Sequence, residues 1–251
     1  MSYLVGLDLG QSRDCSALVI VEQQQIPPAQ PTYAVRHLYR WPLDTPYPRI
    51  TRDLEALLAR PPLAGRHELV VDQTGCGRPM VDQLRQAGLS LIAVSLHGGD
   101  TVSQVGSNYR TPKRDLVGVT HVLLQQHRLQ FAEALPLTPV LTQELLSFKV
   151  KIDPATAHES YSAWREKDHD DLVLALALAL WWGERTAASR IPGLSLAPAL
   201  DLRQRPMARR ATQMPGQRRP RDASPDDSVW AIQEAVRRRW GVSGYDEDDD
   251  V

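Results

Sequence analysis

The segment LVLALALALWW, residues 172–182, is the strongest constraint on how this chain can fold. It contains only apolar residues and follows the polar segment REKDHDD, residues 165–171. Leu and Ala favour a helix, and a helix that is apolar on every side must be surrounded by other elements. The sequence therefore predicts a helix buried inside a layered domain. Two adjacent carboxylates, Asp170 and Asp171, lie at its N-terminal end, where the helix dipole favours negative charge.

Hydropathy and cysteine content exclude several classes of protein. No stretch of about 18 apolar residues is free of charge, so we expect no transmembrane span. The first residues lack the basic segment and cleavage site of a signal peptide. Cys15 and Cys76 show no metal-ligand spacing, and we interpret both as free thiols in a reducing compartment. We therefore expect a cytoplasmic protein that does not associate with membranes.

Strand-like and helix-like segments alternate along most of the chain. Three strands predict an antiparallel meander, and a helix, a strand, a helix, a strand and further helices follow it. This order predicts an α/β fold with a mixed sheet, in which the fourth and fifth strands are parallel and helices cover both faces. The ribonuclease H-like fold uses this succession. The predicted strands are 3–10, 16–23, 32–41, 67–75 and 89–97, with an edge strand at 159–164, and the predicted helices before the Leu/Ala segment are 50–62, 77–88, 111–129 and 137–150.

The composition changes near residue 189 and divides the chain into two parts. Residues 1–188 form the predicted α/β domain, and residues 189–251 are rich in Pro and Arg and contain no Lys. We expect a flexible tail with one short helix at 228–241 and an acidic C-terminus. Arg-rich segments either contact nucleic-acid phosphates or form solvated linkers, and both interpretations stay open here.

Three carboxylates lie within or at the ends of predicted elements. Asp8 lies in the first strand, Asp72 ends the fourth strand, and Asp171 opens the Leu/Ala helix. Each one alone could simply cap a turn or a helix. In the predicted order, however, the first and fourth strands are neighbours and the last helix packs across them, so the three carboxylates should converge. Like charges at close range raise one another's pKa or else need a cation, and carboxylates suit two ions of Mg²⁺ or Mn²⁺ that assist phosphodiester hydrolysis.

Four segments together resemble the nuclease domain of tailed-phage terminase large subunits, a family that shares its fold with RuvC-type resolvases. They read GLDLGQSRDCSALVIVE, VVDQTGCGRPMVDQLRQAGL, TPKRDLVGVTHVLLQQHRL and HDDLVLALALALWW. The resemblance spans roughly residues 1–187. Its most specific parts are D-x-T-G-x-G-R after a strand and the late HDD before the Ala/Leu repeat. The resemblance implies a metal-dependent DNA endonuclease.

The resemblance also implies roles for individual residues. Asp8 and Asp72 match metal ligands of the family, and the late helix supplies a third, for which Asp171 is favoured and Asp170 is the second choice or partner. His169 matches a position that orients a water or a ligand, although a simple contact with the helix end is an equal alternative. Many relatives carry a further acid where this chain has Leu174, which leaves fewer ligands for a second ion.

The resemblance implies partners as well. Large terminase subunits carry an ATPase motor, but GCGRPM lacks the Lys and the Ser or Thr of a phosphate-binding loop. Either the motor is a separate chain, or this chain is a free-standing nuclease of the same lineage. The resemblance implies the host-cell cytoplasm as the setting, where the chain cuts concatemeric viral double-stranded DNA during packaging. A separate ATPase motor, a small terminase subunit and a portal are the partners that this setting implies.

Several residues near the predicted site are candidates for contacts with the DNA backbone. Gly75, Gly77 and Arg78 lie where the fourth strand passes into a helix, whose free amides can hold phosphate. A tight strand-to-helix turn would need only the glycines. Lys113 and Arg114 begin another helix and could contact DNA or simply be solvated.

Three other functions fit parts of the pattern. A junction resolvase would use the same chemistry as a dimer on branched DNA. A non-catalytic scaffold would keep the fold without the ions, as the missing acid at Leu174 allows. An actin-like ATPase also begins with D-x-G on its first strand, but it needs a second related domain.

Overall fold

A computed structural model describes residues 2–10, 14–26, 29–74, 77–132, 135–147 and 170–189. The predicted edge strand at 159–164 lies outside these ranges, as does the predicted tail apart from Ser189. In the part of the chain that is described, no helix combines the length and hydropathy needed to cross a membrane.

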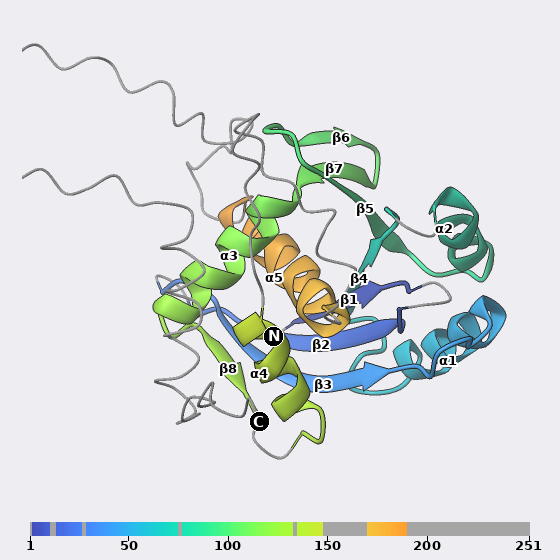
Figure 1. The fold of residues 1–251 in the computed structure, drawn as a ribbon, viewed down its shortest axis with the longest axis horizontal. Helices are drawn as coiled ribbons and strands as arrows, with labels where there is room; N and C mark the ends of the chain where they lie inside the picture. The colour runs from blue at the N-terminus through green and yellow to red at the C-terminus, as the bar shows by residue number, and fades with distance from the viewer. Residues whose placement is uncertain are drawn as a thin grey trace, which may run out of the picture.

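The described residues contain an eight-stranded mixed sheet (Figure 1), with the strand order β6-β7-β5-β4-β1-β2-β3-β8. β1, β2 and β3 form the predicted antiparallel meander, and β4 and β5 run parallel to β1. The predicted ribonuclease H-like arrangement, with β1 and β4 adjacent, is therefore confirmed. The strands are β1 (Ser2–Asp8), β2 (Ala17–Gln24), β3 (Thr32–Arg40), β4 (His67–Asp72), β5 (Leu91–His97), β6 (Ser103–Val105), β7 (Asn108–Pro112) and β8 (Leu129–Phe131).

Sequence patterns missed three strands: β6, β7 and β8. β6 and β8 have three residues each and β7 has five, which is too short to show a period-two pattern. β6 and β7 pair as an antiparallel hairpin, and β7 pairs in parallel with β5. The sheet therefore extends beyond β5, on the side where α2 lies (Figure 1).

Helices cover both faces of the sheet, as predicted. Side chains of α3, α4 and α5 share hydrophobic clusters with one face, and those of α1 and α2 share a cluster with the other. The helices are α1 (Tyr47–Leu58), α2 (Gly77–Gln86), α3 (Lys113–Gln125), α4 (Thr138–Ser147) and α5 (Asp171–Ser189).

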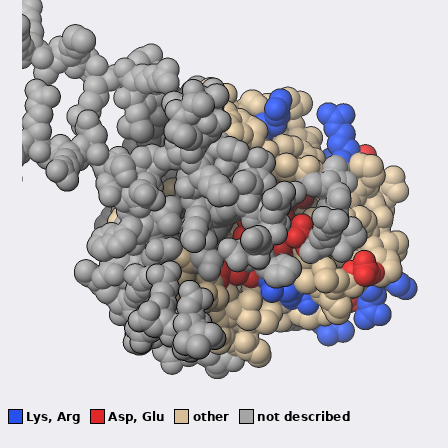
Figure 2. All heavy atoms as spheres, in the orientation of Figure 1, with Lys and Arg blue, Asp and Glu red and all other residues tan. Residues whose placement is uncertain are grey.

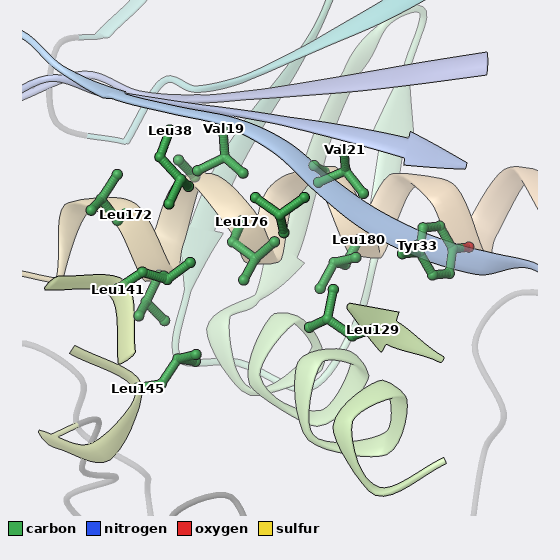
Figure 3. Close-up of a cluster of buried hydrophobic side chains, with 14 of the residues drawn as sticks. Val19, Val21, Tyr33, Leu38, Leu129, Leu141, Leu145, Leu172, Leu176 and Leu180 are labelled. Atoms are coloured by element: carbon green, nitrogen blue, oxygen red, sulfur yellow. The ribbon is translucent and has the colours of Figure 1, made fainter. Parts of the chain in front are cut away.

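The Leu/Ala segment forms α5 and is buried on all sides. Leu172, Leu176 and Leu180 recur every four residues and pack into one cluster with residues of β2, β3, α3 and α4 (Figure 3). Ala177 and Trp181 belong to a second cluster, which contains residues of β4, β5, β7 and α3. Because each side of α5 meets a different element, the helix needs no polar stripe.

Gly6 lets α5 approach the sheet unusually closely. A Cβ atom at Gly6 would lie 1.8 Å from the carbonyl oxygen of Ala175, so only glycine fits this point of β1. Further along the helix, a Cβ atom at Gly183 would lie 2.6 Å from the Leu4 side chain. The helix therefore runs antiparallel to β1, and its first residues lie over the edge where β1 ends.

We predict that Gly6→Ala lowers the free energy of unfolding by about 3 kcal/mol, since backbone atoms of α5 would have to move away from β1. Gly118→Ala is the matched control, because a Cβ atom there meets nothing within 4 Å. In an exposed helical position it should raise stability by about 0.5–1 kcal/mol. Urea unfolding of both variants measures the difference, and equal stabilities would contradict the close approach.

Candidate functional site

Asp8 and Asp72 lie side by side at one edge of the sheet. They are the last residues of the parallel neighbours β1 and β4, and the residues before them, Leu7 and Val71, are register partners. Adjacent strands are about 4.8 Å apart. Both carboxylates are buried, at 7% and 3% exposure, and side-chain alternation turns both toward the α5 face. Two buried like charges at this spacing require compensation by cations or by protonation.

The Asp72 side chain is held in place by its own turn. The backbone N–H of Thr74 donates a 2.7 Å hydrogen bond to Asp72 Oδ1. The turn-capping role that the sequence allowed is therefore present. It fixes the orientation of the carboxyl group rather than excluding another role for it.

Asp171 reaches the same edge from α5. It is the first residue of the helix and is 2% exposed. Its Oδ2 lies 3.3 Å from Arg40 Nη2, at the end of β3. Ala17 on β2 is the register partner of both Arg40 and Asp8, so the three residues form one row across the sheet. Asp171 therefore lies above the row that ends in Asp8 and Asp72.

Arg40 also pairs with Glu144, a buried residue of α4. Glu144 Oε2 accepts a 3.1 Å hydrogen bond from the backbone N–H of Val173, in the first turn of α5. Burial raises the pKa of Glu144 to about 7, although the nearby Arg40 charge opposes this rise. Glu144 thus accepts a hydrogen bond from one of the backbone N–H groups that have no partner within the helix at its start. This contact links α4 to the end of α5 that carries Asp171.

Lys113 belongs to the same group of charges. Its side chain is 8% exposed, and its Nζ lies 3.6 Å from Asp170 Oδ2. The sequence suggested either a DNA contact or a solvated residue, whereas the structure places Lys113 against the start of α5. Arg114, by contrast, is on the surface and pairs with Asp100 at 2.7 Å.

Acidic and basic side chains therefore alternate around the N-terminal end of α5 (Figure 2). Among the residues that the structure describes, no group of three or more His, Cys, Asp or Glu side chains is arranged to hold a metal ion. Instead, the two carboxylates at the start of the helix face two cations of the chain itself. The pairs are Asp171 with Arg40 and Asp170 with Lys113.

Apart from Lys113 and Arg114, described above, the predicted site residues fall into three groups in the structure. Asp8 and Asp72 end β1 and β4, Asp171 begins α5, and Asp170 directly precedes that helix at the same edge of the sheet. Arg78 is on α2, which covers the other face of the sheet and begins at Gly77. Gly75 and His169 lie outside the described residues.

Sequence reasoning missed Arg40 and its ion pair with Glu144. A β-bulge explains why the contact was not foreseen: the β2–β3 register shifts between Ile20 and Val21. Without that shift the side chain of Arg40 would point to the opposite face. The only signal in the sequence was an Arg at the end of a strand.

Comparison with known proteins gave matches only among solved structures. The sequence matches no protein-family model and no curated protein. The large terminase nuclease from thermophilic phage G20c is 20% identical, with a TM-score of 0.49 over 71% of this chain and 80% of that one. The large terminase of another thermophilic bacteriophage is 12% identical, with a TM-score of 0.48 over 71% of this chain and 39% of that one. RuvC of Thermus thermophilus is 15% identical, with a TM-score of 0.38 over 74% and 95%. At these values the likenesses assign no activity to this chain.

We predict that Arg40→Met lowers the free energy of unfolding by roughly 3 kcal/mol, since it removes the cation shared by two buried carboxylates. Arg114→Met is the control, because Arg114 and its partner Asp100 are both exposed side chains. The control should cost less than about 1 kcal/mol. Chemical unfolding near neutral pH compares the two, and an equal loss would contradict a special role for Arg40.

Proposed function

We propose that this chain is a divalent-metal-dependent endonuclease that hydrolyses DNA phosphodiesters. One observation carries the proposal: Asp8 and Asp72 end adjacent parallel strands on the face that α5 covers, and Asp171 begins α5 above the same edge. The three residues come from distant parts of the chain. A fold built only for stability gains little from collecting buried carboxylates at one point, because burying each charge is costly.

Asp8, Asp72 and Asp171 are chemically the kind of donor that hard divalent cations prefer. Asp8, Asp72 and Asp171 would hold Mg²⁺ or Mn²⁺ through carboxylate oxygens, which these ions prefer. Bound in a pair, such ions supply an activated water and stabilise the leaving oxygen of a phosphodiester. Leu174, where an acid would give a further ligand, is buried inside α5 at 2% exposure. Asp170 is therefore the remaining carboxylate of the late helix that could serve a second ion.

Arg40 and Lys113 act on these carboxylates as fixed counter-charges. They lower the cost of burying Asp171 and Asp170 before any ion binds. Glu144, held by Arg40, connects this arrangement to α4. The chain's own cations therefore keep the start of α5 over the edge of the sheet.

The biological setting follows from the sequence resemblance to terminase nuclease domains. In that setting the chain cuts concatemeric viral DNA during genome packaging, in the cytoplasm of the host cell. Double-stranded DNA is the substrate, and an ATPase motor on another chain, a small terminase subunit and a portal are the partners.

We predict that the wild-type protein nicks plasmid DNA in the presence of Mn²⁺. Asp8→Asn and Asp72→Asn should each reduce the rate by at least about 100-fold, because each removes a charged ligand worth several kcal/mol in the transition state. Conversion of supercoiled plasmid to open-circular and linear forms on a gel measures the rate. A four-way junction tested beside linear duplex separates a terminase-like nuclease from a resolvase.

Asp53→Asn is the control for this assay. Asp53 lies on α1, which packs on the face of the sheet away from α5, and it bonds to Trp41 and Arg49. Its rate should equal that of the wild type. If Asp8→Asn cuts as fast as Asp53→Asn, the nuclease activity resides elsewhere and the proposal fails.

We also predict that Mn²⁺ stabilises the folded protein. Binding to the native state alone adds about 2.7 kcal/mol at a concentration 100 times the Kd, so the melting temperature should rise by several degrees and fall again with EDTA. Asp8→Asn should lose this shift, whereas Asp53→Asn should keep it. Differential scanning fluorimetry measures the shift without any substrate, and a shift that survives in Asp8→Asn would contradict the proposed ligand.

A further inference from the structure

A cavity of about 600 Å³ opens at the same edge of the sheet, on the face opposite α5. Its floor is formed by Gln73, Ser95 and Arg110. Gln73 donates a 2.9 Å hydrogen bond to Ser95, and Ser95 is the register partner of Arg110. Gln73 follows Asp72 directly, and successive side chains of a strand point to opposite faces. The floor therefore begins one residue from the candidate active site.

Helix α2 forms one wall of the cavity and presents arginines to it. Arg78 and Arg85 both line the cavity and are seven residues apart, which is two helical turns or about 10 Å along one side of the helix. Arg85 donates to Ser107 and Asn108 at 3.1 and 2.9 Å, and so links α2 to the β6–β7 hairpin that forms the other wall.

The cavity carries an excess of positive charge. Three arginines line it, with Asp82 as the one acidic lining residue among those described, and Asp82 lies 3.9 Å from Arg85. Arg78 and Arg110 are exposed and have no ion-pair partner in the described part of the chain. Figure 2 shows basic side chains over the β6–β7 hairpin and between it and α2. Unpaired guanidinium groups in a groove attract anions.

We propose that this cavity, between α2 and the β6–β7 hairpin, binds the sugar-phosphate backbone of the DNA strand that enters the candidate active site. The inference rests on the proposed nuclease function and specifies where the substrate lies. Arg78 and Arg110 contact phosphates, and Arg85 mainly holds the two walls together.

The shape and chemistry of the cavity favour a nucleic-acid backbone over a single small anion. Its arginines come from two elements and are spread over about 10 Å of α2, while duplex DNA carries one phosphate on each strand for every 3.4 Å of helix axis. Tyr109 is the one aromatic residue among the lining residues described, and its ring packs against Trp181 and Trp182 on the α5 face. Arginine contacts to phosphates carry no sequence information, so binding is expected to be largely independent of sequence.

The test is the affinity of the full chain for a fluorescently labelled mixed-sequence duplex, measured by anisotropy in EDTA so that no hydrolysis occurs. Arg78→Gln and Arg110→Gln should each weaken binding roughly fivefold near 0.1 M salt. Each should also reduce the slope of log K against log[salt] by about 1. Arg78→Lys and Arg110→Lys keep the charge and should restore most of the affinity.

Arg36→Gln is the matched control, since Arg36 is also exposed but pairs with Glu22 and lies on β3, several strands away from the cavity in the strand order. It should bind DNA like the wild type. The inference is overturned if the Arg78 and Arg110 variants bind like the wild type, if Arg36→Gln loses as much affinity as they do, or if the wild-type protein binds no duplex.

Asp8→Asn separates this inference from the proposed function. It should bind the duplex as tightly as the wild type or more tightly, because it removes a negative charge, and yet fail to nick plasmid. If the Arg78 and Arg110 variants bind DNA like the wild type while Asp8→Asn fails to nick plasmid, the proposed role of the cavity alone is overturned. If Asp8→Asn nicks plasmid while the Arg78 and Arg110 variants bind DNA weakly, the catalytic assignment alone is overturned.

Discussion

The close approach of α5 to β1 at Gly6 sets the geometry of everything else in this domain. A side chain at this point would overlap the carbonyl oxygen of Ala175, so the absence of one fixes how deeply the helix lies on the sheet. One helical turn before Ala175 is Asp171, and two strand residues after Gly6 is Asp8. The two steps are of similar length, about 6 Å and 6.8 Å. The packing contact thereby determines that both carboxylates reach the same edge.

Placing carboxylates at the start of the buried helix α5 is unfavourable, and nearby charged side chains of the same chain compensate for it. Arg40 from β3 and Lys113 from α3 neutralise the carboxylates at the start of α5, and Glu144 from α4 satisfies a backbone N–H there. Each contact joins α5 to a different element. Removing one partner of a buried charged pair is generally far more destabilising than removing both. The same contacts that stabilise the fold therefore position the candidate ligands.

The proposed metal site and the proposed phosphate-binding cavity lie on opposite faces of the sheet, next to consecutive residues of the chain. Asp72 turns toward α5 and the acidic site, whereas Gln73 turns toward α2 and the arginine-lined cavity. Strand alternation makes this separation automatic. The negative charges that would hold cations and the positive charges that would hold phosphates thus lie close together without neutralising one another.

The sequence by itself determined the buried helix and the meander followed by parallel strands. It also placed Asp8 in the first strand, Asp72 at the end of the fourth strand and Asp171 at the start of the late helix. These features depend on local periodicity and on the rules of strand connection. Only the tertiary structure decided that Arg40 and Lys113 face these carboxylates and that the short β6–β7 hairpin closes a cavity against α2. The shift of the β2–β3 register between Ile20 and Val21 determines on which face of the sheet Arg40 lies, and three-residue strands form only because they pair with neighbouring strands. Neither the bulge nor the short strands produce a recognisable sequence pattern, because both depend on contacts between residues that are distant in the sequence.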